Sequence, residues 1–248
     1  MTGKTQAVLE VNNIAVHYGG IKAVNGISFS LEPGRISGIL GPNGSGKTTL
    51  LGALTRMGSL TSGSLVFLGQ DYSKVPARKI LSLGIARTFQ TVRVLPDRTV
   101  LDNILLGTDA LSSSRAGNVK ENVRQAIERT GLEGFEQVRP GELSYGVQRR
   151  VEIARAIAAQ PSLLLLDEPT AGMNQHERQE IGTLLRKLSE EGLTQLLIEH
   201  DVQMMLDTCD KLFAMNFGVL IAEGTPESVV QSIAVQESYL GKRAQQNA

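Results

Sequence analysis

The chain of 248 residues contains one cysteine, three histidines and no tryptophan. The single cysteine, Cys209, excludes an internal disulfide, and three histidines argue against a dedicated zinc site. Neither sign of charge is in excess, since 25 basic side chains match 25 acidic ones, which argues against a dedicated nucleic-acid binder. No apolar run exceeds four residues, whereas a membrane-spanning helix needs about twenty. The first residues, MTGKTQAVLE, lack the apolar segment of a secretory signal. We therefore expect a soluble, cytosolic, globular protein.

Apolar segments of strand length alternate with helical patterns along most of the chain. Helices are expected at 47–57 and 175–191, and Asn174 is placed to cap the second of them. Such alternation predicts an α/β fold whose mostly parallel sheet is covered on both faces. The expected strands are 8–16, 24–31, 35–40, 64–68, 84–89, 163–166, 194–199 and 211–216.

Residues 91–160 form the exception to this alternation. The segments 99–107, 118–131 and 146–159 all have helical spacing, and no convincing strand separates them. We expect a helical subdomain inserted at 91–160 within one domain that spans 1–248. The polar segment 111–118, LSSSRAGN, is predicted to be a surface loop.

The segment 41–48, GPNGSGKT, matches the phosphate-loop pattern G-x-x-x-x-G-K-[ST] between an expected strand and an expected helix. Glycines let the backbone curl so that successive N–H groups point at phosphate oxygens, and the helix adds its positive N-terminal end. Lys47 adds a full charge, and the Thr48 hydroxyl can bind magnesium. The motif predicts ATP or GTP binding by Gly41, Pro42, Asn43, Gly44, Ser45, Gly46, Lys47, Thr48 and Thr49.

Four leucines at 163–166 precede Asp167 and Glu168. A strand buried on both faces would place the two acids in the ligand crevice at its carboxyl end. Asp167 is then positioned to hold magnesium through water, and Glu168 to polarise an attacking water molecule. An ordinary strand end with solvated acids is the alternative, and the nearby phosphate loop argues against it.

Over nearly its whole length the sequence resembles the ATP-binding cassette family, the nucleotide-binding subunits of ABC transporters. This resemblance implies a P-loop NTPase (RecA-like) core with an N-terminal antiparallel β subdomain and the inserted α-helical subdomain. Tyr18 stands where the family places an aromatic ring on adenine, with Val24 as an apolar neighbour. Gln90 matches the glutamine that touches magnesium and water, and His200 matches the switch histidine that contacts the γ-phosphate.

The segment 143–148, LSYGVQ, resembles the family signature Leu-Ser-Gly-Gly-Gln. Tyr145 replaces the first glycine and Val147 separates the second from the glutamine, but Ser144 and Gly146 are retained. In the family, these two residues face a phosphate of the ATP that the other subunit holds. The segment 171–174, AGMN, corresponds to the family's D-loop and ends in asparagine where aspartate is usual.

The resemblance implies an ATPase in which two cassettes sandwich ATP and Mg²⁺ head to tail. Lys47, Glu168 and His200 would be the catalytic residues. Thr48, Gln90 and Asp167 would bind the metal. Expected partners are a second cassette, multi-spanning permease subunits and, indirectly, a substrate-binding protein, with no nucleic acid. The chain would then lie on the cytoplasmic face of the plasma membrane.

Several stretches are most similar to the branched-chain amino acid importers: 84–90, 143–146, 148–155, 171–174 and 222–241. The chain departs from that subgroup by a shorter segment between Gln90 and the signature, and relatives that handle urea or short amides share these stretches. A soluble cassette ATPase, for example in iron–sulfur cluster assembly, remains an alternative. A GTPase or small-molecule kinase would leave Tyr18, the signature and His200 unexplained.

Overall fold

The computed structural model describes residues 6–109 and 118–246, whose strands form two sheets. The larger has the order β10-β9-β3-β8-β7-β6, in which β3, β6, β7, β8 and β9 run parallel and β10 pairs antiparallel with β9. The smaller is antiparallel, with the order β2-β1-β4-β5. The strands of the larger sheet are β3 (Ile36–Leu40), β6 (Ile85–Arg87), β7 (Leu163–Asp167), β8 (Thr194–Ile198), β9 (Lys211–Asn216) and β10 (Val219–Gly224). Those of the smaller are β1 (Leu9–Tyr18), β2 (Ile21–Leu31), β4 (Ser62–Phe67) and β5 (Gln70–Asp71).

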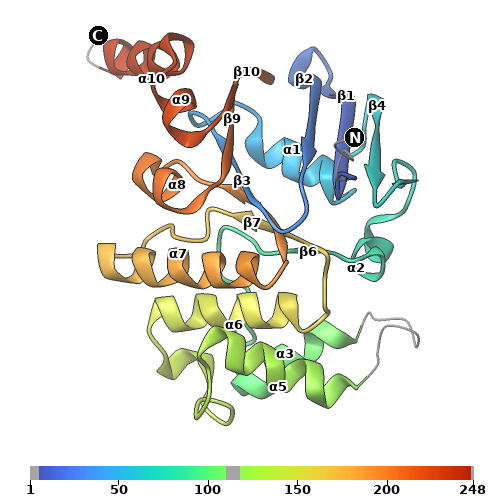
Figure 1. Cartoon of the computed structure of the whole chain (residues 1–248), viewed down its shortest axis with the longest axis vertical. Coiled ribbons are helices and arrows are strands. Elements are labelled where there is room, and N and C mark those ends of the chain that lie inside the picture. Colours follow the sequence, from blue (N-terminus) through green and yellow to red (C-terminus); the bar gives the residue numbers. More distant parts are fainter. Residues whose placement is uncertain (1–5, 110–117, 247–248) are drawn as a thin grey trace, which may run out of the picture.

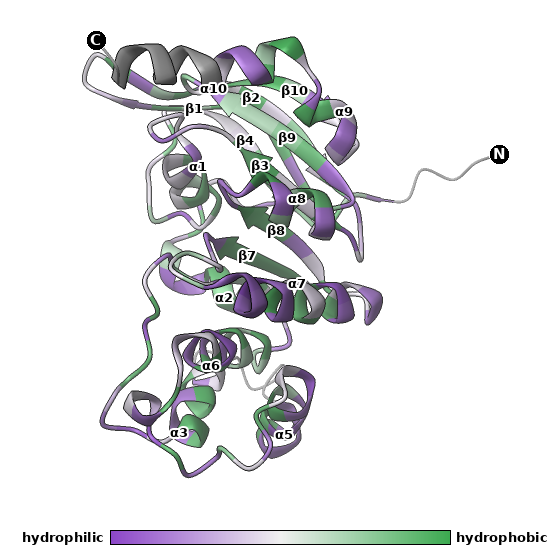
Figure 2. Cartoon of the chain, turned by 90° about the vertical axis from the view of Figure 1, so that its left-hand side faces the viewer, coloured by the Kyte–Doolittle hydropathy of each residue, from purple (hydrophilic) through white to green (hydrophobic). Residues whose placement is uncertain are grey.

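Strands β3, β7 and β8 are buried at every position, which is why their sequences are mostly apolar rather than alternating. Successive side chains of a strand point to opposite faces, and the leucines of β7 show this directly. Leu164 and Leu166 pack into the core beneath the helices, whereas Leu163 and Leu165 pack into the core shared with the antiparallel sheet. Figure 2 shows β7 and β8 as hydrophobic strands beside helices with hydrophilic outer faces.

Helices cover the sheet and extend the molecule at one end. They are α1 (Lys47–Leu54), α2 (Ile80–Leu83), α3 (Val100–Leu105), α5 (Val119–Thr130), α6 (Tyr145–Ile157), α7 (Gln175–Glu190), α8 (Val202–Thr208), α9 (Pro226–Val230) and α10 (Ile233–Gln246). Short 3₁₀ turns occupy Ala77–Lys79, Leu106–Thr108 and Pro140–Glu142. Helices α3, α5 and α6 gather at the end of the molecule opposite α10 (Figure 1). The predicted α/β, RecA-like architecture with an antiparallel β part is confirmed.

Capping side chains mark where the helices between residues 99 and 157 begin. Thr99 forms a capping box with Asp102, Asn118 caps α5, and Ser144 caps α6. The capping role predicted for Asn174 is confirmed, since its side chain accepts from the N–H of Glu177 at the start of α7. Apart from Asn118, the predicted surface loop at 111–118 lies outside the described residues.

The first helix ends earlier than predicted, at Leu54 instead of position 57. Arg56 adopts a left-handed conformation with φ 58°, and the N–H of Gly58 donates to the carbonyl of Gly52, which closes the helix. The patterns also missed α8 and β10, which are short, and α10, which lies at the C-terminal end of the described residues. Within the two described ranges, no helix has both the length and the apolar character needed to cross a membrane.

Candidate functional site

The parallel neighbours β3, β8 and β7 end at the same edge of the larger sheet, and a cavity of about 580 Å³ opens there. Segments far apart in the sequence line it: the start of β2, the phosphate loop, the segments after β6, β7 and β8, and the turn after β9. Nine of the predicted site residues contribute: Asn43, Gly44, Gly46, Lys47, Thr48, Thr49, Gln90, Glu168 and His200. Ile21, Lys22, Ala23, Phe217 and Gly218 also line it, and sequence analysis did not select them.

The phosphate loop needs its glycines for two different reasons. Gly44 and Gly46 have φ angles of 81° and 103°, which residues with a Cβ rarely adopt. Gly41 has no such angle, but a Cβ there would collide with the carbonyl oxygen of Met215 on β9. Gly41 therefore lets the loop pack closely against the sheet, and Gly44 and Gly46 allow its left-handed backbone conformations.

Helix α1 begins directly after this loop, and its first turn faces the cavity. The N–H of Leu50 donates to the carbonyl of Gly46, so the N–H groups of Thr48 and Thr49 have no acceptor within the helix. Together with the positive end of the helix dipole, these donors suit an anion such as a phosphate. The Thr48 and Thr49 residues line the cavity, so the donors lie where the ligand would bind.

Lys47 is only 6% exposed and its charge is held inside the loop. Its Nζ donates to the carbonyl oxygens of Gly41 and Pro42 at 2.6 and 3.1 Å. Pro42 thus contributes through its backbone, although its side chain does not line the cavity. A buried ammonium group held at this position is well placed to meet a phosphate oxygen.

Glu168 is the point at which three predicted residues meet. The Nε2 of Gln90 donates to Glu168 Oε2 at 2.9 Å, and Nδ1 of His200 lies 3.6 Å from the same oxygen. The φ of Glu168 is 44°, an unusual value for a residue with a side chain, and its N–H donates to the carbonyl of Ile198 on β8. Such strain costs about 1–3 kcal/mol and is typical of functional sites.

Asp167 does not line the cavity, and its partner was not foreseen. Arg87, at the end of β6, places Nη2 2.9 Å from Asp167 Oδ2, and both side chains are largely buried. The guanidinium also lies 4.9 Å from the centre of the Phe89 ring. An arginine at the end of an apolar strand, three residues before Gln90, is the sequence signal that could have suggested a partner for an acid on the neighbouring strand.

The residues on this cavity fit magnesium held together with a nucleotide better than magnesium held by protein alone. Across 6–109 and 118–246, no group of three His, Cys, Asp or Glu residues is arranged to hold a metal ion. Mg²⁺ commonly binds through one or two protein groups and the phosphates of its substrate. The Thr48 hydroxyl and Gln90 are such groups on this wall.

The predicted base-stacking residue, Tyr18, lies at the end of β1 and is paired across the hairpin with Ile21. Its side chain is 57% exposed but is not part of the cavity wall, whereas Ile21 is. The neighbour proposed for it was wrong, because Val24 is fully buried in the core and the adjacent Ala23 lines the cavity instead.

Comparisons with known proteins agree with this geometry. A family model described as "ABC transporter" matches residues 24–171. The chain belongs to the ABC transporter family. It is 35% identical to the high-affinity branched-chain amino acid transport ATP-binding protein BraF of Pseudomonas aeruginosa and 36% identical to LivG of Escherichia coli K12. Each similarity covers 96% of this chain and 99% of the relative.

Among solved structures, the ADP conformation of MJ1267, an ATP-binding cassette of an ABC transporter, superposes with a TM-score of 0.88. The two chains are 32% identical, and the match covers 96% of this chain and all of the other. A dimeric ABC transporter cassette, MJ0796, matches with a TM-score of 0.75 at 26% identity. This chain is therefore a nucleotide-binding cassette of a family that hydrolyses ATP.

The segment 143–148, which resembles the family signature, lies apart from the cavity, at the start of α6. The Ser144 hydroxyl accepts from the N–H of Val147 at 3.4 Å and is exposed. Gly146 is buried, and a Cβ there would meet the carboxylate of Glu177 at 3.2 Å. The N-terminus of α6 thus lies outside the nucleotide cavity of its own chain, and Ser144 there is exposed.

Arg149 of α6 joins that helix to the segment after β6 that contains Gln90. Arg149 Nη1 and Nη2 donate to the carbonyl oxygens of Phe89 and Gln90 at 2.6 and 2.7 Å. Nη1 also donates to Glu152 Oε2 at 2.6 Å, and Arg149 is completely buried. The segment that contains Gln90 is therefore connected to α6 by the Arg149 guanidinium. The Glu152 carboxylate adds to this connection, because it accepts from the N–H groups of Phe89 and Arg93.

Replacing Arg149 by methionine should lower the free energy of unfolding by about 3–5 kcal/mol, because the buried Glu152 loses its closest charge partner and keeps only the more distant Arg155, at 3.9 Å, among its described ion pairs. Urea unfolding followed by circular dichroism measures this. The double variant Arg149→Met/Glu152→Gln should recover part of the loss. Arg150→Met, on the same helix, should cost less than about 1 kcal/mol, and an equal loss in both arginine variants would contradict the assignment.

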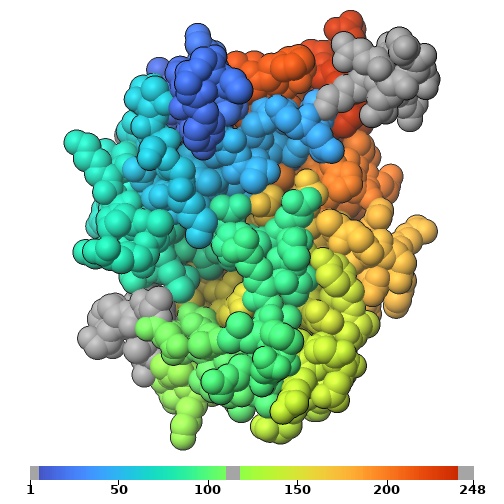
Figure 3. Space-filling model, turned by 180° about the vertical axis from the view of Figure 1, so that it is seen from behind, coloured from blue at the N-terminus to red at the C-terminus, as the bar shows by residue number. Residues whose placement is uncertain are grey.

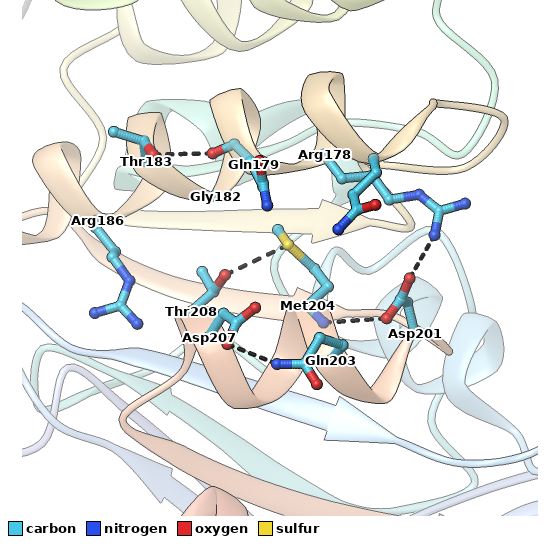
Figure 4. A pocket seen from close by; sticks show the side chains of 11 residues that line it. Arg178, Gln179, Gly182, Thr183, Arg186, Asp201, Gln203, Met204, Asp207 and Thr208 are labelled. Atoms are coloured by element: carbon cyan, nitrogen blue, oxygen red, sulfur yellow. Dashed lines mark hydrogen bonds and ion pairs between the residues drawn. The ribbon is translucent and has the colours of Figure 1, made fainter.

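A second set of contacts joins the segment 171–174 to the segment after His200. Arg178 on α7 donates through Nε to the carbonyl of Met173 and through Nη1 to Asp201 Oδ2, at 3.0 and 2.6 Å. Asp201 in turn caps α8 through the N–H of Met204 (Figure 4). A cavity of about 460 Å³ lies between α7 and α8 and contains none of the predicted site residues.

Proposed function

We propose that this cassette hydrolyses ATP to power the import of branched-chain or other hydrophobic amino acids, or related small amides, through separate membrane subunits. The observation that carries the proposal is likeness along the whole chain to two branched-chain amino acid transport ATP-binding proteins. The cavity chemistry supports it independently, since the groups of a phosphate site and an acid suited to activate water share one wall.

The proposed roles follow from position. Lys47, Thr48 and the backbone of 41–49 bind the phosphates, and Mg²⁺ bound with them neutralises their charge. Glu168 accepts a proton from the attacking water while Gln90 and His200 orient the water and the γ-phosphate. Asp167, paired with Arg87, would hold the metal through water. Tyr18 contacts the base from the end of β1, next to Ile21, which lines the cavity.

We propose that two cassettes, identical or related, enclose two ATP molecules head to tail. Ser144 and Gly146 then contact the phosphate that the other cassette binds, which accounts for their distance from the cavity of their own chain. Residues 91–160 act as a helical subdomain that carries this signature helix. One cassette alone has half of each site and hydrolyses ATP slowly.

We propose that the permease binds at the groove between α2 and β6 on one side and α6 on the other. This groove has a volume of about 280 Å³, and Arg87, Phe89 and Glu152 line it. Arg87 is paired with Asp167, and Glu152 is paired with the arginine that donates to the carbonyl of Gln90. Met57 and Leu106 stand at it with 62% and 42% of their surface exposed. Figure 3 shows the segment after β6, in blue-green, crossing from the sheet to the helices on this side. The cassette would thus work on the cytoplasmic face of the membrane that contains the permease.

Affinity purification of the tagged protein from gently solubilised membranes tests this proposal. Multi-spanning subunits should co-purify, and amino acid uptake by the reconstituted complex should depend on ATP. Recovery with soluble partners alone would instead favour the soluble assembly role, for example with iron–sulfur clusters.

The variants Met57→Glu and Leu106→Glu should abolish this co-purification, because a charge would have to be buried against an apolar partner surface. Their ATP affinity should equal that of the unsubstituted protein. Leu68→Glu, at an exposed apolar position outside the groove, is the matched control and should co-purify normally. Membrane subunits retained by both groove variants would place the contact elsewhere.

A further inference from the structure

Phe217 is the most exposed large hydrophobic side chain in the described part of the protein, at 83%. It stands in the two-residue turn, Phe217-Gly218, that joins β9 to β10. Strand β9 runs parallel to β3, which leads into the phosphate loop, so the turn lies at the same edge of the sheet as the nucleotide cavity. Ile21 is also exposed and lines the cavity, but Phe217 carries an aromatic ring.

The turn itself does not require phenylalanine. Phe217 and Gly218 have φ angles of 43° and 80°, as in a type I′ turn. The first position of that turn favours asparagine, aspartate or glycine, because a bulky residue is strained at positive φ. Phe217 therefore combines a strained backbone with an exposed ring, and neither stabilises the folded chain. Its presence in the turn needs another explanation.

Hydrogen bonds of Gly218 hold the Phe217-Gly218 turn against the phosphate loop and against β2. The N–H of Gly218 donates to the carbonyl of Ser45 at 2.9 Å, and the carbonyl of Gly218 accepts from Asn25 at 2.8 Å. Among the described residues that line the cavity, three have apolar side chains: Ile21, Ala23 and Phe217. The rest are glycines or polar residues that suit phosphates and water.

We propose that Phe217 contacts the purine base of the bound nucleoside triphosphate. The base is the part of that ligand with an apolar face, and an aromatic ring is the side chain that binds such a face best. The exposed ring becomes covered when the nucleotide binds, which explains why a strained phenylalanine occupies the turn. This inference rests on the proposed nucleotide site and adds a second base contact to the one expected at Tyr18.

Phe217→Asn tests the proposal because turn stability and base contact should respond in opposite directions. Asparagine suits positive φ, so the melting temperature of the free protein should rise by a few degrees. The dissociation constant for Mg-ATP should increase about 5- to 20-fold, a range that matches the loss of one stacked ring. Affinity for inorganic tripolyphosphate, which has no base, should stay unchanged. Calorimetric titration measures both affinities.

Leu68→Asn is the matched control. Leu68 also precedes a glycine in a two-residue hairpin turn, with φ 48°, and is 48% exposed, but it does not line the cavity. It should gain stability with no change in either affinity. Unchanged ATP affinity in Phe217→Asn, or equal weakening of ATP and tripolyphosphate, would overturn the base contact. Lys47→Ala separates this failure from failure of the site itself, since it should weaken both ligands.

Discussion

Lys47→Ala should raise the dissociation constant for ATP by about 30- to 150-fold, which corresponds to the loss of one charge-assisted contact of about 2–3 kcal/mol. The buried Nζ is already held by the carbonyl oxygens of Gly41 and Pro42. Its side chain therefore loses little conformational entropy when a phosphate binds. Alanine removes the charge and these two hydrogen bonds, while the glycines that the loop backbone requires stay in place.

Calorimetric titration with ATP and magnesium measures this loss, and circular dichroism checks that the variant is folded. Lys79→Ala is the control, because Lys79 is an exposed lysine in the 3₁₀ turn outside the cavity. ATP affinity equal in Lys47→Ala and the unsubstituted protein would refute the phosphate-loop assignment.

Glu168→Gln should retain ATP binding but slow hydrolysis by about 10²- to 10⁴-fold, the usual contribution of a general base. Glutamine keeps the size of the side chain, and its amide can still contact Gln90, so the cavity shape is preserved. Because the ATP-bound state persists, a closed dimer of cassettes should accumulate.

Phosphate release and light scattering after gel filtration, with ATP and magnesium present, measure these two effects. Glu180→Gln changes an exposed carboxylate of α7 and should leave both unchanged. A variant that stays monomeric and hydrolyses ATP at the original rate would show that Glu168 is not the base.

Much of the fold could be predicted because its signals are local. The leucines of β7 form a continuous apolar run since both faces of that strand are buried, and Asn174 caps α7 through residues three positions apart. The elements that were missed, such as α8 and β10, have short sequence patterns. Such short elements are stabilised mainly by packing against neighbouring elements, which a local pattern does not show.

The phosphate loop was determined by the sequence alone, because eight consecutive residues carry both its backbone conformations and its charge. The ion pair of Arg87 with Asp167 joins residues 80 positions apart, and the contact of Arg149 with Gln90 joins residues 59 apart. Strand order and helix packing, which no local pattern contains, bring these groups together. The same is true of Phe217, which reaches the cavity because β9 pairs with β3. Local chemistry thus predicted a nucleotide ligand, and tertiary structure decided which distant side chains surround its cavity.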